Sequence, residues 1–208
     1  MKKVDYKKDM KELYLPKTTP AFIEVPPISY ITVSGEGDPN GEGFTRACEA
    51  LYSLTYAVKM SYKSGMVPDG YYEYTVFPLE GVWSLIDVSK PVTDKSNYKY
   101  EIMIRQPDFL TNDLFEYFLS ITKKKKPNPY LERASFKTIT EGMCCQMLHL
   151  GSYDDEPASF ALMEKYCTDN GFRRSSLHHR EIYLKNPQTT RPEELKTVLR
   201  FQVERAKG

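Results

Sequence analysis

The sequence predicts an α+β fold made of two pseudo-repeated βαββ units, with helices on the outer faces and a ligand groove between the halves. Short alternating, β-branched runs predict strands, and longer segments with apolar residues three and four positions apart predict helices. The order strand, helix, strand, strand occurs in each half, as a repeat of pattern without obvious sequence identity. At 208 residues the chain is long enough to bury a core without disulfides or a metal.

We therefore expect a single domain over residues 1–208. A charged arm over residues 1–20 precedes a first half over about 21–130 and a second half over about 131–208. Ligands commonly bind where two such halves meet.

The first half contains the first predicted repeat. Residues 28–34 alternate and are β-branched, which predicts a strand, and residues 44–64 place their apolar side chains along one stripe of a helix. Two long strands, 71–86 and 98–105, complete the repeat. Thr111 is then expected to cap a second helix.

The second half repeats this plan in shorter segments that turn residues separate. Its expected elements are strand segments over 134–140 and 143–150, a helix over 157–170, and strands over 179–184 and 197–203. Thr190 and Glu193 have the spacing of a capping box, which predicts a short helix before the last strand.

The balance of charge argues against a dedicated nucleic-acid binder. Lys and Arg number 29 and Asp and Glu 28, a formal net charge of +1, whereas such a binder carries a basic excess on one face. The lysines at 123–126 fit the C-terminal end of a helix, where cations are favoured. We expect no nucleic-acid partner.

The distribution of apolar residues predicts a cytoplasmic protein. No apolar run reaches the roughly 18 residues that a membrane span requires, so we expect no membrane partner. The N-terminal residues also lack the apolar stretch of a secretory signal.

The sequence carries no metal motif. Cys48, Cys144, Cys145 and Cys167 have no CxxC spacing and suit small buried residues in a reducing compartment. The three histidines lack a matching carboxylate motif for zinc. Nucleophilic-serine, zinc-protease and nucleotide-binding motifs are absent, so we expect neither a metal nor an organic cofactor.

The predicted strand over 179–184 offers a candidate carboxylate. Alternate residues of a strand face opposite sides. If Ile182 faces the helices, Glu181 and Tyr183 face the groove. A solvated glutamate that pairs with Arg180 or with a lysine explains the same pattern equally well.

The strand over 143–150 offers two further candidates. We expect Leu148 and Leu150 to face the helices, which directs Met147 and His149 toward the groove. His149 is a candidate proton shuttle, although a hydrogen-bonded structural histidine is the simpler interpretation.

Several aromatic residues lie on both sides of Pro78 in the sequence. The chain has 16 Tyr and 10 Phe but a single Trp, and Tyr72, Tyr74 and Trp83 lie close together in the sequence. Such clusters usually belong to a core, and this one is dense enough to form the wall of a ligand pocket.

Several stretches along nearly the whole chain carry a family resemblance. They are KELYLPK, LYSLTYAVKM, YTVFPLEGVW, IMIRQPDF, KKKKPNP, QMLHLGSYDDEPASF, HREIYLKNP and LKTVLR. With these stretches the chain resembles the GyrI-like small-molecule-binding family, in its standalone form without a DNA-binding domain.

The resemblance implies the SHS2-like fold of two βαββ units, with the ligand groove between them. It implies that Glu181, in HREIYL, is the central acidic residue of the pocket, with an aromatic wall at Trp83 and at the tyrosines of YYEYT. The chain has Ser84-Leu85 where the family often has a second aromatic residue, so the mouth of the pocket is expected to differ.

The resemblance also implies a function. Standalone members are understood to bind toxic aromatic compounds, and some hydrolyse the strained cyclopropane of DNA-alkylating natural products. We therefore expect a protein that binds bulky aromatic xenobiotics and hydrolyses activated cyclopropane rings, with Glu181 directing water. The alternative is a non-catalytic module that binds or sequesters drug cations. A protein-binding role, such as protection of DNA gyrase, would need an exposed acidic surface that the sequence does not indicate.

Overall fold

The computed structural model describes residues 3–91, 93–187 and 189–206. They form two compact units. The first unit contains residues 3–5, Ile28–Phe77 and Trp83–Ile139, and the second contains Tyr6–Pro27, Pro78–Val82 and residues 140–206. Helices and antiparallel strands occur in both units, so the predicted α+β class is confirmed.

An antiparallel sheet forms the first unit. Strand β2 (Ile28–Glu36) lies in its middle, between β4 (Tyr98–Arg105) and β5 (Ala134–Ile139). The last residues of β3 (Leu79–Leu85) continue this sheet beside β4.

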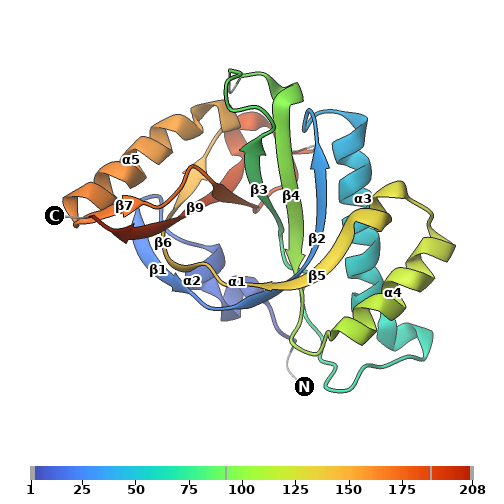
Figure 1. The fold of residues 1–208 in the computed structure, drawn as a ribbon. Helices are drawn as coiled ribbons and strands as arrows, with labels where there is room; N and C mark the ends of the chain where they lie inside the picture. The colour runs from blue at the N-terminus through green and yellow to red at the C-terminus, as the bar shows by residue number, and fades with distance from the viewer. Residues whose placement is uncertain (1–2, 92, 188, 207–208) are drawn as a thin grey trace. The chain divides into compact units, whose positions relative to one another are not determined.

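Two helices complete the first unit. Helix α3 (Glu42–Lys59) packs on β2 with the apolar stripe that the sequence predicts, and Leu54 of this stripe is fully buried. Helix α4 (Asn112–Lys125) packs against α3, as Figure 1 shows. The predicted cap is confirmed, because the Thr111 hydroxyl accepts a hydrogen bond from the backbone N–H of Leu114 at 3.3 Å.

The second unit is a sheet with one long helix. Strands β6 (Gly142–Leu150) and β9 (Lys196–Arg205) pair in its middle. Strand β1 (Ala21–Val25) pairs with β6, and both β8 (His179–Tyr183) and the short β7 (Phe172–Arg174) pair with β9.

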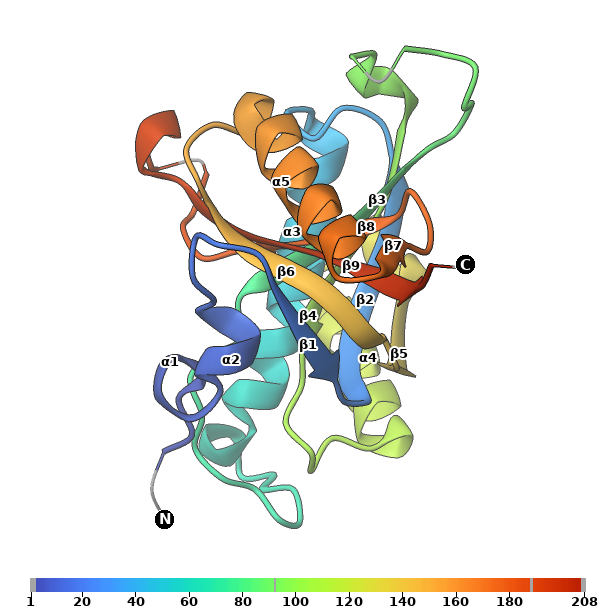
Figure 2. The same ribbon diagram turned by 90° about the vertical axis from the view of Figure 1, so that its left-hand side faces the viewer.

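Helix α5 (Glu156–Asp169) covers one face of this sheet and lies across β6 and β9 in Figure 2. The short helices α1 (Tyr6–Asp9) and α2 (Lys11–Tyr14) precede β1 and bury Tyr6 and Tyr14. Single 3-10 turns occur at Ser61–Ser64, Lys95–Asn97, Pro129–Arg133, Tyr153–Asp155 and Pro192–Glu194.

The structure corrects two predicted elements. The strand expected over 71–86 is wrong before Leu79, because Tyr74 forms only an isolated bridge to Val4. The alternating aromatic residues that suggested a strand pack around Phe109 instead.

The capping box is also wrong. Arg191 occupies the N-cap position of the Pro192–Glu194 turn, and no side chain caps it. Proline at the first position suits the start of a helix, yet only one 3-10 turn forms. Thr190 lies one residue too early to serve as the cap.

Candidate functional site

The pairing of β6, β9 and β8 places Glu181 on a defined face of the second unit. Met147 pairs with Leu199, and Leu199 pairs with Glu181. Directly paired residues of antiparallel strands point to the same side of a sheet. Glu181 therefore shares a face with Met147 and Leu199.

Helix α5 covers this face. Met147 and Leu199 are buried together with Met163 and Cys167 of α5. The predicted orientation of β6 is thus wrong, since Met147 points toward α5 and lies in a core. The prediction that Glu181 and Tyr183 share one face is correct, but that face is the one that carries α5.

The error has a physical cause. The apolar side chain of Ile182 predicts that its own face of the strand carries the helices and that the opposite face is open. Ile182 is fully buried even though it faces away from α5. Because both faces of β8 are covered, alternation alone does not tell which face carries the helix.

Two hydrogen bonds hold the carboxylate of Glu181. The Tyr183 hydroxyl donates to Oε2 at 2.7 Å, and His179 Nε2 donates to Oε1 at 3.0 Å. The side chains of Glu181 and His179 are 12% and 21% exposed. The covered face of β8 is therefore not completely closed to solvent at Glu181.

Aromatic rings surround the three side chains on β8. The ring of Phe160 from α5 lies edge-on to His179, with centroids 4.8 Å apart. The ring of Tyr153, in the turn before α5, lies edge-on to Tyr183 at 6.0 Å. Such rings fix the orientation of the polar groups.

A second carboxyl group lies at the start of α5. Glu156 is 6% exposed, and its Oε1 has no hydrogen-bond partner among the residues that the structure describes. Burial, and then the negative charge of Glu181, raise the pKa of Glu156 to about 9. Burial and the charges of Glu181 and Glu156 likewise raise the pKa of Tyr153.

The helix N-terminus does not reverse this effect. A carboxylate at the first turn of a helix gains roughly 0.3–1 kcal/mol, less than the about 1.36 kcal/mol that corresponds to one pKa unit. Burial and a neighbouring carboxylate oppose ionisation more strongly. The site therefore combines a partly exposed carboxylate with a buried carboxyl group that keeps its proton at neutral pH.

His149 has a structural place beside this site. It is 4% exposed, with Nε2 2.9 Å from the carbonyl oxygen of Ser152 and Nδ1 2.9 Å from the hydroxyl of Ser159. A carbonyl only accepts, so Nε2 carries the proton and, in the neutral ring, Nδ1 accepts from Ser159. The hydrogen-bonded interpretation of His149 is confirmed, and its predicted orientation away from the helix is wrong.

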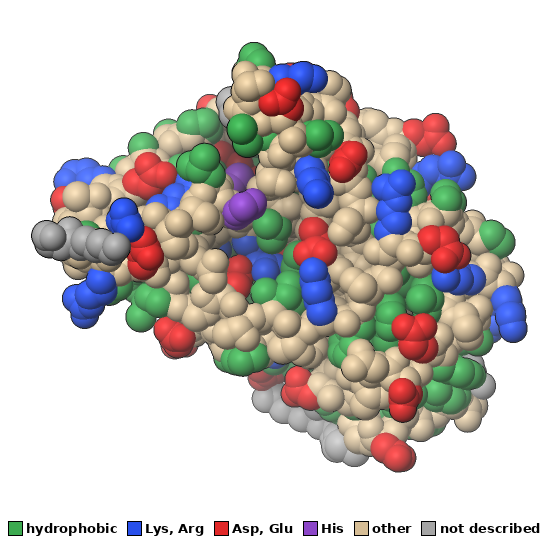
Figure 3. Space-filling model, viewed as in Figure 1, with side chains coloured by type: hydrophobic (Ala, Val, Ile, Leu, Met, Phe, Trp, Pro, Cys, Tyr) green, Lys and Arg blue, Asp and Glu red, His purple; other side chains and the backbone are tan. Residues whose placement is uncertain are grey.

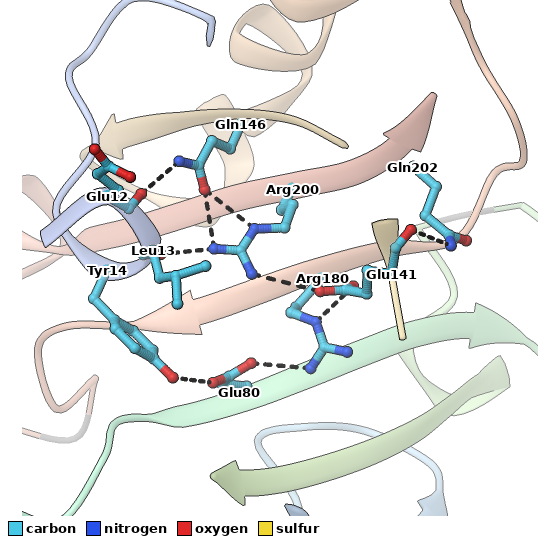
Figure 4. Close-up of polar contacts among 9 residues, drawn as sticks. All are labelled: Glu12, Leu13, Tyr14, Glu80, Glu141, Gln146, Arg180, Arg200 and Gln202. Atoms are coloured by element: carbon cyan, nitrogen blue, oxygen red, sulfur yellow. Dashed lines mark hydrogen bonds and ion pairs between the residues drawn. The ribbon is translucent and has the colours of Figure 1, made fainter. Parts of the chain in front are cut away.

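A network of buried charges occupies the opposite face of the same sheet (Figure 4). Arg180 donates to Glu80 at 2.9 Å and to Glu141 at 2.8 Å. Arg200 donates to Gln146 at 2.9 and 3.1 Å and to Glu141 at 3.4 Å. The network thus contains two arginines and two glutamates. Arg180 faces away from Glu181, so the alternative in which Glu181 pairs with Arg180 is wrong.

The N-terminal arm binds this network through its backbone. Arg200 donates to the carbonyl oxygen of Leu13 at 2.6 Å, and the Gln146 amide donates to that of Glu12 at 2.7 Å. The Tyr14 hydroxyl lies 3.5 Å from Glu80. These contacts explain how the face of Arg180 and Ile182 is covered.

The remaining aromatic candidates belong to the first unit. Trp83 is partly buried and packs against Phe44 and Tyr100, with ring centroids 5.7 and 5.6 Å apart. Tyr72 and Tyr74 pack around Phe109, and Tyr74 is 1% exposed. Tyr74 is therefore a core residue, and a role of Trp83 and Tyr72 at the ligand stays a prediction.

Sequence reasoning missed four residues of this site: Tyr153, Glu156, Phe160 and His179. His179 could have been found, since it lies two residues before Glu181 and therefore shares its face. Tyr153 and Glu156 belong to a polar turn, and only the packing of α5 on β8 reveals their burial.

The described part of the chain, residues 3–91, 93–187 and 189–206, holds no group of three or more His, Cys, Asp or Glu side chains arranged to hold a metal ion. No helix within these ranges is long and apolar enough to cross a membrane. Figure 3 shows acidic and basic side chains intermingled on the viewed face, with histidine (purple) exposed among them.

The chain is similar to several known proteins. A model of the GyrI-like small molecule binding domain matches residues 18–204. A crystal structure of a protein described as a hydrolase from Listeria innocua is 35% identical, covers 98% of this chain and 100% of its own, and has a TM-score of 0.91. Among curated proteins, none matches.

Two further crystal structures extend the comparison. An uncharacterized conserved protein from Listeria innocua is 36% identical over 97% of this chain and 100% of its own, with a TM-score of 0.90. The C-terminal domain of EcmrR is 14% identical over 90% of this chain and 98% of its own, with a TM-score of 0.54. The latter likeness concerns the fold alone.

Proposed function

Because the chain belongs to the GyrI-like small-molecule-binding domain family, we propose that it binds bulky aromatic molecules and hydrolyses activated cyclopropane rings of DNA-alkylating natural products. The observation that carries the proposal is the partly exposed carboxylate of Glu181, which His179 and Tyr183 hold beside aromatic rings. Two similar Listeria innocua structures described as hydrolases, each 35% identical, support an enzymatic role.

Glu181 acts as the general base in this proposal. It accepts a proton from a water molecule, and the water oxygen forms a bond to a methylene carbon of the cyclopropane. The strained C–C bond breaks, and its electron pair enters the ring as the dienone becomes aromatic. The dienone oxygen gains a proton and becomes a phenol, so the product is the substrate plus one water.

His179 and Tyr183 position the base. Each donates to a different oxygen of Glu181, so the carboxylate has one orientation in which its remaining lone pairs can accept from water. Release of ring strain and gain of aromaticity already favour the product. A general base typically contributes about 10²–10⁴-fold, which suffices for such a reaction. The proposed steps use no metal or organic cofactor.

Self-protection determines where the protein would act. An alkylator must be destroyed in the compartment that contains the DNA, and we therefore place the protein in the cytoplasm, with the aromatic compound as its partner.

The test is incubation of the purified protein with a spirocyclopropyl-cyclohexadienone, with products followed by mass spectrometry. We expect a mass gain of one water, faster than in buffer, and a loss of about 10²–10⁴-fold in Glu181→Gln. Glu116→Gln, the same change at an exposed position of α4, is the control and should keep full activity. Equal rates for Glu181→Gln and the wild type would refute the role of Glu181.

A second candidate function is binding without chemistry. Glu181 and Glu156 lie close enough to interact, and the rings of Tyr153, Tyr183 and Phe160 lie beside them. A carboxylate among aromatic rings, here that of Glu181, attracts planar cations. Unchanged compound that copurifies with the protein, and affinity that rises with ligand charge, would favour sequestration over hydrolysis.

A further inference from the structure

We propose that Glu156 is the proton donor of the proposed hydrolysis, an inference that rests on the function proposed for the Glu181 site. Glu181 removes a proton from water, and Glu156 gives a proton to the dienone oxygen as that oxygen becomes a phenol. The two carboxyl groups then have opposite roles, although they belong to the same residue type.

The position of Glu156 supports this role. It begins α5, on the face of the sheet that carries Glu181, and it interacts with Glu181 and with Tyr153. It is more than nine-tenths buried, and Oε1 has no partner in the described ranges 3–91, 93–187 and 189–206. A buried carboxyl oxygen without a partner costs free energy, which a bound ligand that accepts a hydrogen bond would recover.

The surroundings keep Glu156 protonated in the resting protein. The charged group that faces it from β8 is Glu181, an anion, and the phenol that faces it from the turn before α5 is Tyr153. Glu181 is in turn held by His179 and Tyr183. One turn along α5, Ser159 binds the ring of His149.

This arrangement follows a general rule for pairs of carboxyl groups. Two neighbouring carboxylates resist double ionisation, so the pair retains one proton. Burial assigns that proton to Glu156, since Glu181 is the more exposed of the two. Environments that differ in this way separate an acid from a base.

The proton balance of the step closes. One proton passes from water to Glu181, and one passes from Glu156 to the dienone oxygen, so the substrate gains one water in total. The pair ends with the proton on Glu181 rather than on Glu156. Return of that proton to Glu156, within the pair or through solvent, restores the resting state without any further reactant.

The experiment measures turnover of the spirocyclopropyl-cyclohexadienone as a function of pH. In the wild type we expect kcat to fall as pH rises through the pKa of Glu156, near 9. In Glu156→Gln we expect kcat at pH 7 to fall by about 10²–10⁴-fold and this alkaline decline to disappear. Glu156→Asp, which keeps a carboxyl group, should recover part of the activity.

The controls separate a proton donor from a structural residue. Glu164→Gln makes the same change at an exposed position of α5 and should retain wild-type kcat. Glu156→Gln should bind the phenolic product with unchanged affinity, which shows that the site is intact.

The outcomes also separate this inference from the function on which it rests. Turnover by the wild type that Glu156→Gln retains in full would overturn the role of Glu156 and leave the hydrolysis intact. A wild-type protein without turnover would overturn both. A wild-type alkaline decline that persists unchanged in Glu156→Gln would assign the titration to another group and overturn the inference.

Discussion

Glu80 and Glu156 are both buried carboxyl groups of the second unit, but they meet different neighbours. Glu80 is completely buried and contacts Arg180, whose charge opposes the rise in pKa that burial causes. Glu156 meets Glu181, whose charge adds to that rise. A neighbouring cation favours the ionised form of a buried acid, whereas a neighbouring acid favours its protonated form.

The proton on Glu156 predicts a pH dependence of stability. Its pKa in the folded protein, about 9, exceeds that of an unfolded glutamate, about 4.3. The stability that the proton provides is complete below about pH 4.3 and is lost as pH rises toward 9. Glu156→Gln lacks this dependence, so its free energy of unfolding should decline less between pH 5 and pH 8.

Thermal unfolding at these two pH values measures the difference. The expected change is on the order of a few kcal/mol, which in a chain of this size corresponds to several degrees in Tm. Parallel pH profiles for the wild type and Glu156→Gln would show that Glu156 is ionised in the folded protein.

Some residues of the site could be predicted from the sequence, because alternation is a local property. Glu181 and Tyr183 share a face in any regular strand, and their hydrogen bond confirms it. The burial of Glu156 could not be predicted, since a glutamate at a helix start is normally solvated. It depends on β8 lying under α5, which strand order determines.

Helix α5 is the element that connects the core to the site. Its middle packs on β6 and β9 through Met163 and Cys167, and its first residue is Glu156. The position of the carboxyl group therefore depends on packing more than one turn away. This helix could be predicted from Pro157 near its start and Asn170-Gly171 at its end, because these local signals do not depend on the surface that the helix covers.

We expect Met163→Ala to destabilise the second unit. Met163 is completely buried, and truncation of a large core side chain to alanine costs about 2–5 kcal/mol. Leu162→Ala is the matched control: Leu162, the preceding residue of α5, is 55% exposed, so its truncation should change stability by less than about 1 kcal/mol. Urea denaturation measures both, and equal effects would contradict the packing of α5.

Short strands escaped prediction for a different reason. Strand β1 has five residues between prolines, and β7 has three. Segments of this length carry too little periodicity to distinguish a strand from a loop. They exist because β6 and β9 offer edges with which they pair.

At the scale of the whole molecule, the buried network joins segments that lie far apart in the chain. Arg180 and Arg200 connect Glu80, Glu141 and the backbone of the N-terminal arm (Figure 4). Charge balance in such a network matters more than the number of its ion pairs, because an unpaired buried charge is costly.

We expect Arg180→Met to be strongly destabilising. The side chain is 2% exposed, and its loss leaves Glu80 and Glu141 without their shared cation, at a cost of about 3–5 kcal/mol. Arg191→Met is the control, since Arg191 is 70% exposed and its ion pairs contribute less than about 1 kcal/mol. Chemical denaturation of both variants checks the prediction, which a small loss in Arg180→Met would contradict.

The contacts of the arm also have a consequence for synthesis on the ribosome. Glu12 and Leu13 are synthesised early. The residues that donate hydrogen bonds to their carbonyl oxygens, Gln146 and Arg200, leave the ribosome only after most of the chain has been made. Strand β1 likewise has no pairing partner until β6 has been synthesised. Contacts of such long sequence separation form slowly. The nascent arm therefore remains without its partners until β9 leaves the exit tunnel, while α3 already has β2 beside it.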